Sequence, residues 1–150
     1  MTSARQIGNL LYRYGALMDA GDFAAIVPLF AHARLRLVGG QEVGAAEMLG
    51  IWQRMIILYP CGTPRTKHVI TNPIIEIDED AGKATCRSVY TVLQATDGFA
   101  LQIIAAGRYH DTFTRIDGEW HFAHRDYSML DMQGDLSHHL KDMTKGNENG

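Results

Sequence analysis

Apolar residues recur every three or four positions over residues 4–18, which is the spacing of one face of an amphipathic α-helix. Gly21 can end this helix, and Asp22 can cap a second, shorter helix that runs to residue 30. A third apolar stripe predicts a helix over residues 43–58, which Pro60 would end. The first part of the chain is therefore expected to be mainly helical.

Alternation of polar and apolar residues replaces the helical spacing elsewhere. It predicts a short strand over residues 32–38 and a series of long strands in the second half of the chain. The long strands are expected over residues 66–77, 83–96, 99–115 and 119–130. Asp97-Gly98 and Asp117-Gly118 are hairpin signals, so these strands are expected to pair as an antiparallel meander.

Helices followed by antiparallel strands predict an α+β fold, with the helices gathered on one face of the sheet. Pro73 and Gly107 interrupt two of the predicted strands, and such residues mark bulges or bends. A sheet that bends at these positions can curve around the helices and enclose a cavity.

The composition is that of one globular domain without a basic surface. The chain has 150 residues, of which 46% are hydrophobic and 21% charged, and its formal net charge is −3. Nucleic acids and anionic membranes attract basic patches, so neither is an expected partner. No stretch approaches the roughly 18 apolar residues of a membrane span, and the N-terminal residues lack the apolar core of a signal peptide. We therefore expect a cytoplasmic protein.

The cysteines and histidines do not form a metal-binding pattern. Cys61 and Cys86 lie outside any zinc-ligand spacing, and reduced thiols are the expectation, although the sequence leaves a disulfide open. The adjacent His138 and His139 cannot converge on one metal ion by themselves. Nucleotide-binding glycine motifs are absent. We expect no metal and no cofactor, so any chemistry must come from side chains.

Two polar residues are candidates for that chemistry. His68 lies among β-branched residues and shares a strand face with Ile70 and Asn72, so its ring needs a partner if that face is buried. Asp19 ends the first predicted helix, where the helix dipole disfavours a carboxylate. A structural histidine and an exposed carboxylate in a turn are the ordinary alternatives, and the residues alone leave them open.

Tyr14 and Arg125 are less distinctive. Tyr14 belongs to the apolar stripe of the first helix, and an ideal helix turns by about 140° between Tyr14 and Asp19, so the spacing does not place both in one pocket. On the last predicted strand, alternation puts Arg125 on the same face as His121 and opposite to Trp120.

Three segments together resemble the SnoaL-like branch of the superfamily named after nuclear transport factor two. They are LLYRYGALMDAGDFAAIVPLF, TKHVITNPIIEID and GRYHDTFTRIDGEWHFAHR, which follow in the expected order between residues 4 and 131. The resemblance implies a cone-shaped curved antiparallel sheet wrapped around N-terminal helices over residues 1–133, a cystatin-like α+β barrel with a pocket at its open end. Residues 134–150 would then form a polar C-terminal tail.

The resemblance also implies roles for single residues. Scytalone dehydratase, bile acid 7α-dehydratase and hexachlorocyclohexane dehydrochlorinase use an Asp at the end of the first helix and a His on the strand after the third helix, and Asp19 and His68 occupy those places. Tyr14 and Arg125 match a tyrosine and an arginine of the bile acid dehydratase type. His110 lies where scytalone dehydratase has a second histidine.

What this resemblance implies is a cofactor-independent lyase or isomerase acting on a small hydrophobic molecule of carbonyl-containing, steroid, aromatic or polyketide-like type. His68 would be the base, Asp19 would orient it, and Tyr14 or Arg125 would polarise the substrate. Further substrate contacts are expected from His110, Trp52, Met55 and Asn72, with Leu17 and Val89 in the pocket walls.

The family also contains non-catalytic β subunits of ring-hydroxylating dioxygenases, so a non-catalytic subunit or a small-molecule-binding module is the alternative. An open cavity that contains the Asp–His pair favours the enzyme, and a cavity filled with side chains favours the scaffold. Apolar residues on both faces of the long strands, such as Ile103 beside Ile104, favour a homo-oligomer, either dimer or trimer, that buries the outer face of the sheet.

Overall fold

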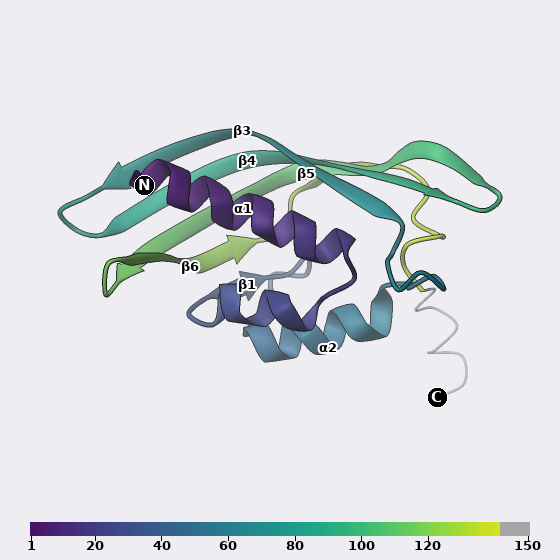
Figure 1. Ribbon diagram of the computed structural model, residues 1–150, viewed down its shortest axis with the longest axis horizontal. Coiled ribbons are helices and arrows are strands. Elements are labelled where there is room, and N and C mark those ends of the chain that lie inside the picture. The colour runs from purple at the N-terminus through teal and green to yellow at the C-terminus, as the bar shows by residue number, and fades with distance from the viewer. Residues whose placement is uncertain (142–150) are drawn as a thin grey trace.

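The computed structural model describes residues 1–141 and shows helices packed against one face of a long curved sheet (Figure 1). In chain order the elements are α1 (Ser3–Asp19), the 3₁₀-helix η1 (Ala24–Phe30), β1 (Arg34–Arg36), β2 (Glu42–Val43), α2 (Ala45–Met55), β3 (Thr66–Asp78), β4 (Lys83–Thr96), β5 (Phe99–Ile116), β6 (Glu119–Asp126) and β7 (Leu130–Gln133). The predicted α+β class is confirmed.

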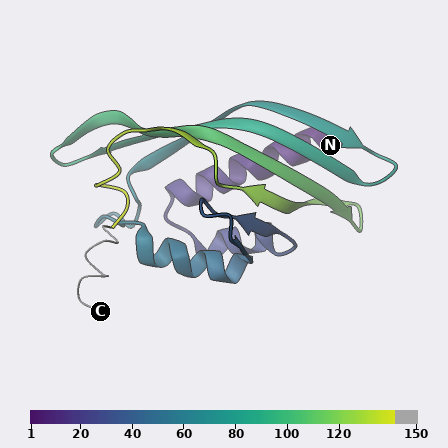
Figure 2. The same ribbon diagram turned by 180° about the vertical axis from the view of Figure 1, so that it is seen from behind.

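The sheet has seven strands in the order β2-β1-β6-β5-β4-β3, and β7 pairs with β5 beside this path. All strand pairs are antiparallel except β1 with β6, which run parallel. The sheet curves over α1 without closing on itself, and Figure 2 shows the same arrangement from behind. The expected meander of long strands is therefore present, and the short strands β1 and β2 extend it beyond β6.

Two predicted helices differ in type or length from what the sequence pattern indicated. The segment expected as an α-helix before residue 30 is a 3₁₀-helix that contains Pro28, whose ring nitrogen cannot donate to an α-helical hydrogen bond. The third helix covers only Ala45–Met55 and not residues 43–58, because Ile56 already has an extended backbone and bridges to Leu140.

One face of α1 is buried against the inner face of the sheet, as its apolar stripe predicted. Its buried residues are Ile7, Gly8, Leu11, Tyr14, Gly15 and Met18. The core continues through closely packed aromatic rings, with the ring of Phe122 centred 4.8 Å from both Phe30 and Phe113. Burial of these large rings is the main source of stability at this end of the domain.

Both interruptions expected in the long strands coincide with irregular pairing. The pairing of β3 with β4 shifts around Pro73, and the pairing of β5 with β7 shifts at Gly107. A Cβ atom on Gly107 would lie 2.3 Å from the carbonyl oxygen of Met129 and 2.6 Å from the hydroxyl oxygen of Tyr90. A side chain there cannot fit, so glycine permits the close approach of the chain that leads into β7.

A bulge in β6 corrects the predicted position of Arg125. The pairing of β6 with β5 slips between Phe122 and His124, which makes Ala123 an extra residue in β6. Because side chains alternate along a strand, the extra residue moves Arg125 onto the buried inner face together with Trp120. Strict alternation had placed these two side chains on opposite faces, and that prediction was wrong.

The side chain of Arg125 is fully buried and forms an ion pair with Asp111 on β5. Its Nε and Nη2 atoms donate to the two carboxylate oxygens of Asp111 at 2.7 and 3.0 Å, and both side chains are 0% exposed. The guanidinium carbon lies 3.9 Å from the ring centre of Tyr109 and 4.5 Å from that of Tyr14. Aromatic faces therefore surround the cation on the sides that the carboxylate leaves free.

The C-terminal segment up to residue 141 belongs to the folded domain. Lys141 donates its backbone N–H to the carbonyl oxygen of Met55 at 2.8 Å, which ties residues 134–141 to the end of α2. The expected boundary between domain and tail at residue 133 therefore falls too early. Residues 142–150 of the predicted tail lie outside the described residues.

Replacing Asp111 by Ala would leave the Arg125 guanidinium buried without its carboxylate. We expect Asp111→Ala to lower the free energy of unfolding by about 3–5 kcal/mol, measured by urea denaturation. The double variant Asp111→Leu with Arg125→Met removes both charges and should recover most of this loss. Equal losses in the single and double variants would contradict an uncompensated charge as the cause.

Candidate functional site

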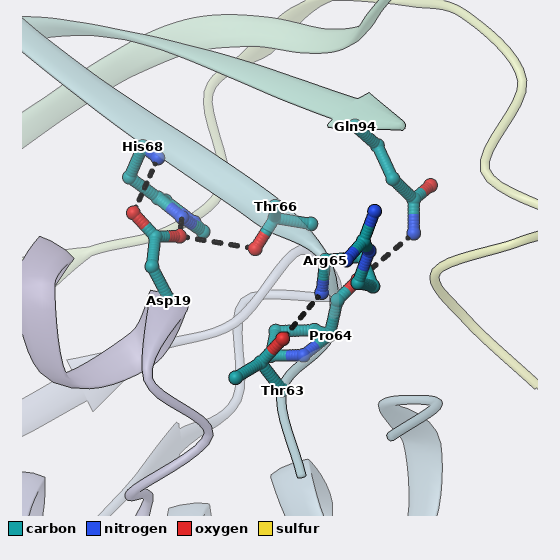
Figure 3. A network of polar contacts seen from close by, with 7 residues as sticks. All are labelled: Asp19, Thr63, Pro64, Arg65, Thr66, His68 and Gln94. Atoms are coloured by element: carbon teal, nitrogen blue, oxygen red, sulfur yellow. Dashed lines mark hydrogen bonds and ion pairs between the residues drawn. The ribbon is translucent and has the colours of Figure 1, made fainter. Parts of the chain in front are cut away.

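The end of α1 and the start of β3 meet through the side chains of Asp19 and His68 (Figure 3). The Nδ1 atom of His68 lies 2.6 Å from Oδ1 of Asp19, and the backbone N–H of His68 donates to Oδ2 at 2.7 Å. Thr66 donates its hydroxyl to Oδ1 of Asp19 at 3.0 Å. The structure thus brings together the two residues that the sequence analysis singled out.

These contacts explain how a carboxylate is tolerated at the C-terminal end of a helix. The Asp19 side chain is only 10% exposed, and its oxygens accept three hydrogen bonds from β3. Because an ionised carboxylate only accepts hydrogen bonds, Nδ1 of His68 must carry the hydrogen. In the neutral form of the ring, the other nitrogen, Nε2, therefore carries no hydrogen and is available as an acceptor.

His68 forms part of the wall of a cavity of about 240 Å³ between α1, the sheet and the C-terminal segment. The wall is mainly apolar, and its polar groups come from tyrosines and histidines. The lining residues are Tyr14, Met18, Val38, His68, Tyr90, Val92, Ile104, Ala105, Tyr109, Tyr127, Leu130, Leu136, His139 and Leu140. Asp19 does not line the cavity, but it contacts His68 through the ring nitrogen Nδ1.

Four tyrosines give the cavity hydroxyl groups that stay protonated. Burial raises the pKa of Tyr14, and the positive charge of Arg125 partly offsets this effect. Burial also raises the pKa of Tyr109 and Tyr127 well above the ordinary value, and that of Tyr90 to about 12. At neutral pH these hydroxyls are therefore hydrogen-bond donors and not bases.

The remaining residues expected to touch a bound molecule lie elsewhere. Arg125 is enclosed by Asp111 and aromatic rings and does not reach the cavity. Trp52 packs in the core against Tyr14, with ring centres 6.4 Å apart, and its neighbour on α2, Met55, also lies outside the cavity wall.

Two expected cavity residues are displaced by strand geometry. His110 alternates with the inward-facing Tyr109 and is therefore exposed on the outer face of the sheet, as Val89 is beside Tyr90. Asn72 was expected on the face of His68. It is instead exposed at the irregular part of β3, with a positive φ of 54°. These three assignments to the pocket were wrong.

Sequence reasoning missed three of the tyrosines and His139. Tyr90 and Tyr109 are diagonal neighbours on the paired strands β4 and β5, and their rings stack with centres 4.5 Å apart, so strand alternation could have identified both. His139 carried no such signal, because nothing in the chain pattern showed that residues after 133 return to the cavity.

Two kinds of feature are absent from the described part of the chain. Residues 1–141 contain no group of three or more His, Cys, Asp or Glu side chains arranged to hold a metal ion. Across the same residues, no helix has the length and apolar character to cross a membrane. Both described cysteines are free, with Cys61 exposed and Cys86 buried.

Solved structures share this fold at low sequence identity. A variant of Rv3472 from Mycobacterium tuberculosis, a protein of unknown function, is 24% identical over 89% of this chain and 73% of its own, with a TM-score of 0.66. A protein from Novosphingobium aromaticivorans, provisionally assigned as a scytalone dehydratase, is 21% identical over 88% of this chain and 86% of its own, with a TM-score of 0.67.

The fold also occurs in a subunit of a larger enzyme. The β subunit of a provisionally assigned aromatic-ring-hydroxylating dioxygenase from Novosphingobium aromaticivorans is 15% identical, covers 90% of this chain and 94% of its own, and has a TM-score of 0.66. No curated protein sequence matches the chain. The family description "SnoaL-like domain" matches residues 1–126, and the chain therefore belongs to the SnoaL-like family.

Proposed function

We propose that this protein is a cofactor-independent lyase of dehydratase type, or an isomerase, acting on a small hydrophobic molecule that carries a carbonyl group. One observation carries the proposal: His68 is held by Asp19 and lies in the wall of a tyrosine-lined, otherwise apolar cavity. A scaffold subunit has no need for an open cavity with an oriented base inside it.

The first step assigned to His68 is removal of a proton from the carbon next to the substrate carbonyl. Its Nε2 atom takes this proton, and Asp19 stabilises the resulting imidazolium through Nδ1. In an elimination, the electron pair of the broken C–H bond forms the C=C bond while the bond to the β-hydroxyl breaks. The leaving oxygen takes the proton back from His68 and departs as water, so no external reactant is required.

An isomerisation needs the same base and a different fate of the proton. His68 would return the proton to another carbon of the intermediate, with no bond to a leaving group broken. The geometry of the cavity supports both outcomes equally, and the substrate decides between them.

The tyrosines supply the electrophilic side of the site. The ring of Tyr14 is centred 6.3 Å from that of His68, so both can contact one small molecule. Its protonated hydroxyl can donate to the substrate oxygen on which negative charge develops. Arg125, which the sequence analysis expected to contact the substrate, would act through its contact with the Tyr14 ring and favour charge on that hydroxyl.

The size of the cavity narrows the substrate class. Pockets for drug-sized ligands usually have volumes of about 300–1,000 Å³, and this cavity has about 240 Å³. A compound with a single ring, aromatic or polyketide-like, fits this volume better than a steroid.

The second candidate function is that of a non-catalytic subunit. The structural similarity to the dioxygenase β subunit, together with exposed apolar side chains on the outer face of the sheet, supports it. In that case the cavity would not catalyse a reaction.

The aldol adduct of benzaldehyde and acetone is a suitable first substrate, because its dehydration gives ultraviolet-absorbing benzylideneacetone. We expect kcat/KM to fall about 10²–10⁴-fold in His68→Ala, which lacks the base. Tyr14→Phe should lose about 10²–10³-fold, because it lacks the oxygen-binding donor. Asp19→Asn should also lose activity, since an amide can present the wrong hydrogen-bonding group to Nδ1.

His110→Gln is the matched control, because this histidine lies on the outer face of the sheet and away from the cavity. It should retain wild-type activity. If His68→Ala converts the substrate as fast as the wild-type protein does, the chemistry belongs to other residues. If a panel of such hydroxy-ketones is not converted at all, the non-catalytic subunit becomes the better account.

We also propose that the outer face of the sheet joins copies of this chain into a dimer or trimer. Residues that point away from α1 on four neighbouring strands are large, apolar and exposed. They are Val69, Ile74, Val89, Leu101, Ile103 and Met132. A monomer seldom exposes so many apolar residues on one face.

Sedimentation velocity tests the proposed association. The wild-type chain should sediment as a dimer or trimer, and Ile103→Lys should shift it to monomer, because a charge cannot be buried unpaired in the interface. Tyr12→Lys, at an exposed position on α1, is the control and should leave the assembly unchanged. A monomeric wild-type protein at micromolar concentration would contradict the proposal.

A further inference from the structure

We propose that His139 is a substrate-binding residue, a second imidazole that the C-terminal segment brings to the cavity and that donates a hydrogen bond to an oxygen of the bound molecule. This inference rests on the proposed function, because it concerns the same cavity. It adds a requirement for the substrate: a second oxygen, besides the one held by the tyrosines.

The position of His139 is fixed by backbone contacts on both of its sides. The carbonyl oxygen of His139 accepts the backbone N–H of Ile57 at 2.9 Å. The preceding carbonyl, of His138, accepts Nε2 of Gln94 at 2.9 Å and the hydroxyl of Tyr59 at 2.5 Å. Because the backbone is held here, binding a ligand requires little further ordering of this segment, which favours a role in recognition.

Gln94 links this segment to the Asp19–His68 pair. It is buried at the end of β4, and its Nε2 atom also donates to the carbonyl oxygen of Pro64 at 3.0 Å, two residues before Thr66 (Figure 3). One amide therefore ties the loop that leads into β3 to the segment that carries His139. The two histidines therefore come from the middle and from the C-terminal part of the chain, and Gln94 contacts the segments that carry both.

The two cavity histidines have different partners. Nδ1 of His68 is paired with a carboxylate, whereas Nδ1 of His139 is buried and has no hydrogen-bond partner among residues 1–141. Burial lowers the pKa of His139 to about 4, and repulsion by a charged His68 acts in the same direction, while Asp19 opposes both. His139 is therefore uncharged at neutral pH.

A neutral imidazole still carries one N–H group and can polarise a carbonyl or bind a hydroxyl oxygen without being a base. With the hydrogen on Nε2, the unpaired Nδ1 is an acceptor, and the donor is available to a ligand. The other residues of the C-terminal segment that line the cavity near His139 are the leucines Leu136 and Leu140. His139 itself is only half-buried, so its ring presents a polar group in a wall that is otherwise apolar at this end, and a polar atom of a ligand can pair with it.

The first test uses para-nitrophenol as a probe, because its oxygen resembles a developing oxyanion and its absorbance reports binding. His139→Leu, which keeps an apolar side chain but removes the donor, should bind the probe about 10- to 100-fold more weakly than wild type. His139→Gln keeps an N–H donor and should recover most of that loss. Equal affinities of wild type and His139→Leu, or no measurable binding to wild type, would overturn the inference.

Nuclear magnetic resonance of the histidine rings is the second readout. The His139 ring should titrate near the lowered pKa given above, and para-nitrophenol should shift its ring resonances in His68→Ala as well as in wild type. A normal titration of about 6.5 with no shift on probe binding would show that His139 faces solvent and not a ligand.

Neither readout needs turnover, so the inference and the proposed function can fail separately. If His139→Leu loses probe binding and the wild-type protein converts no hydroxy-ketone, the binding role of His139 is supported and the proposed lyase or isomerase activity is contradicted. Full kcat/KM in a folded His139→Leu variant, with loss in His68→Ala, would keep the enzyme and overturn the role of His139.

Discussion

The site depends on one carboxylate, that of Asp19, which fastens the last residue of α1 to the first residues of β3. Its oxygens accept from the Thr66 hydroxyl and from both the backbone and the ring of His68. A nearly buried charge is stable only when its hydrogen-bonding capacity is filled, so this contact fixes how the helix enters the curve of the sheet. The same contact involves only Nδ1 of His68, and in the proposed function the other ring nitrogen, Nε2, is the base that faces the substrate.

Much of the frame could be predicted from the sequence, because periodicity depends on neighbouring residues. The apolar stripe of α1 and the limits of β4 are local features, and the structure agrees with both. The anomaly of a carboxylate at a helix end was also a usable signal, since it required a partner that the chain pattern could not identify. Family resemblance supplied that partner as His68, and the structure places the two side chains 2.6 Å apart.

The errors arose where one residue changes the phase of a strand. Alternation was counted through Ala123 and through the irregular part of β3, so Arg125 and Asn72 were assigned to the wrong faces. A bulge is set by the partner strand, and no pattern in a single strand reveals it. The C-terminal segment is a related case: its polar composition indicates a tail, yet a backbone hydrogen bond to Met55 of α2 and a bond from the Gln94 side chain of β4 hold it in place, and composition describes neither.

The roles proposed for Arg125, His68 and His139 follow from the groups that lie next to each side chain. Arg125 is enclosed with Asp111, so its charge reaches the cavity only through the faces of Tyr14 and Tyr109. In the proposed mechanism His68, whose Nδ1 is paired with Asp19, accepts the proton, whereas His139, whose Nδ1 has no partner within residues 1–141, acts as a donor. A molecule with oxygens on two neighbouring functional groups would meet a base and two kinds of neutral donor in one cavity. Such an arrangement would suit the proposed loss of water from a hydroxy-ketone, because the proton, the carbonyl and the leaving hydroxyl must be handled together.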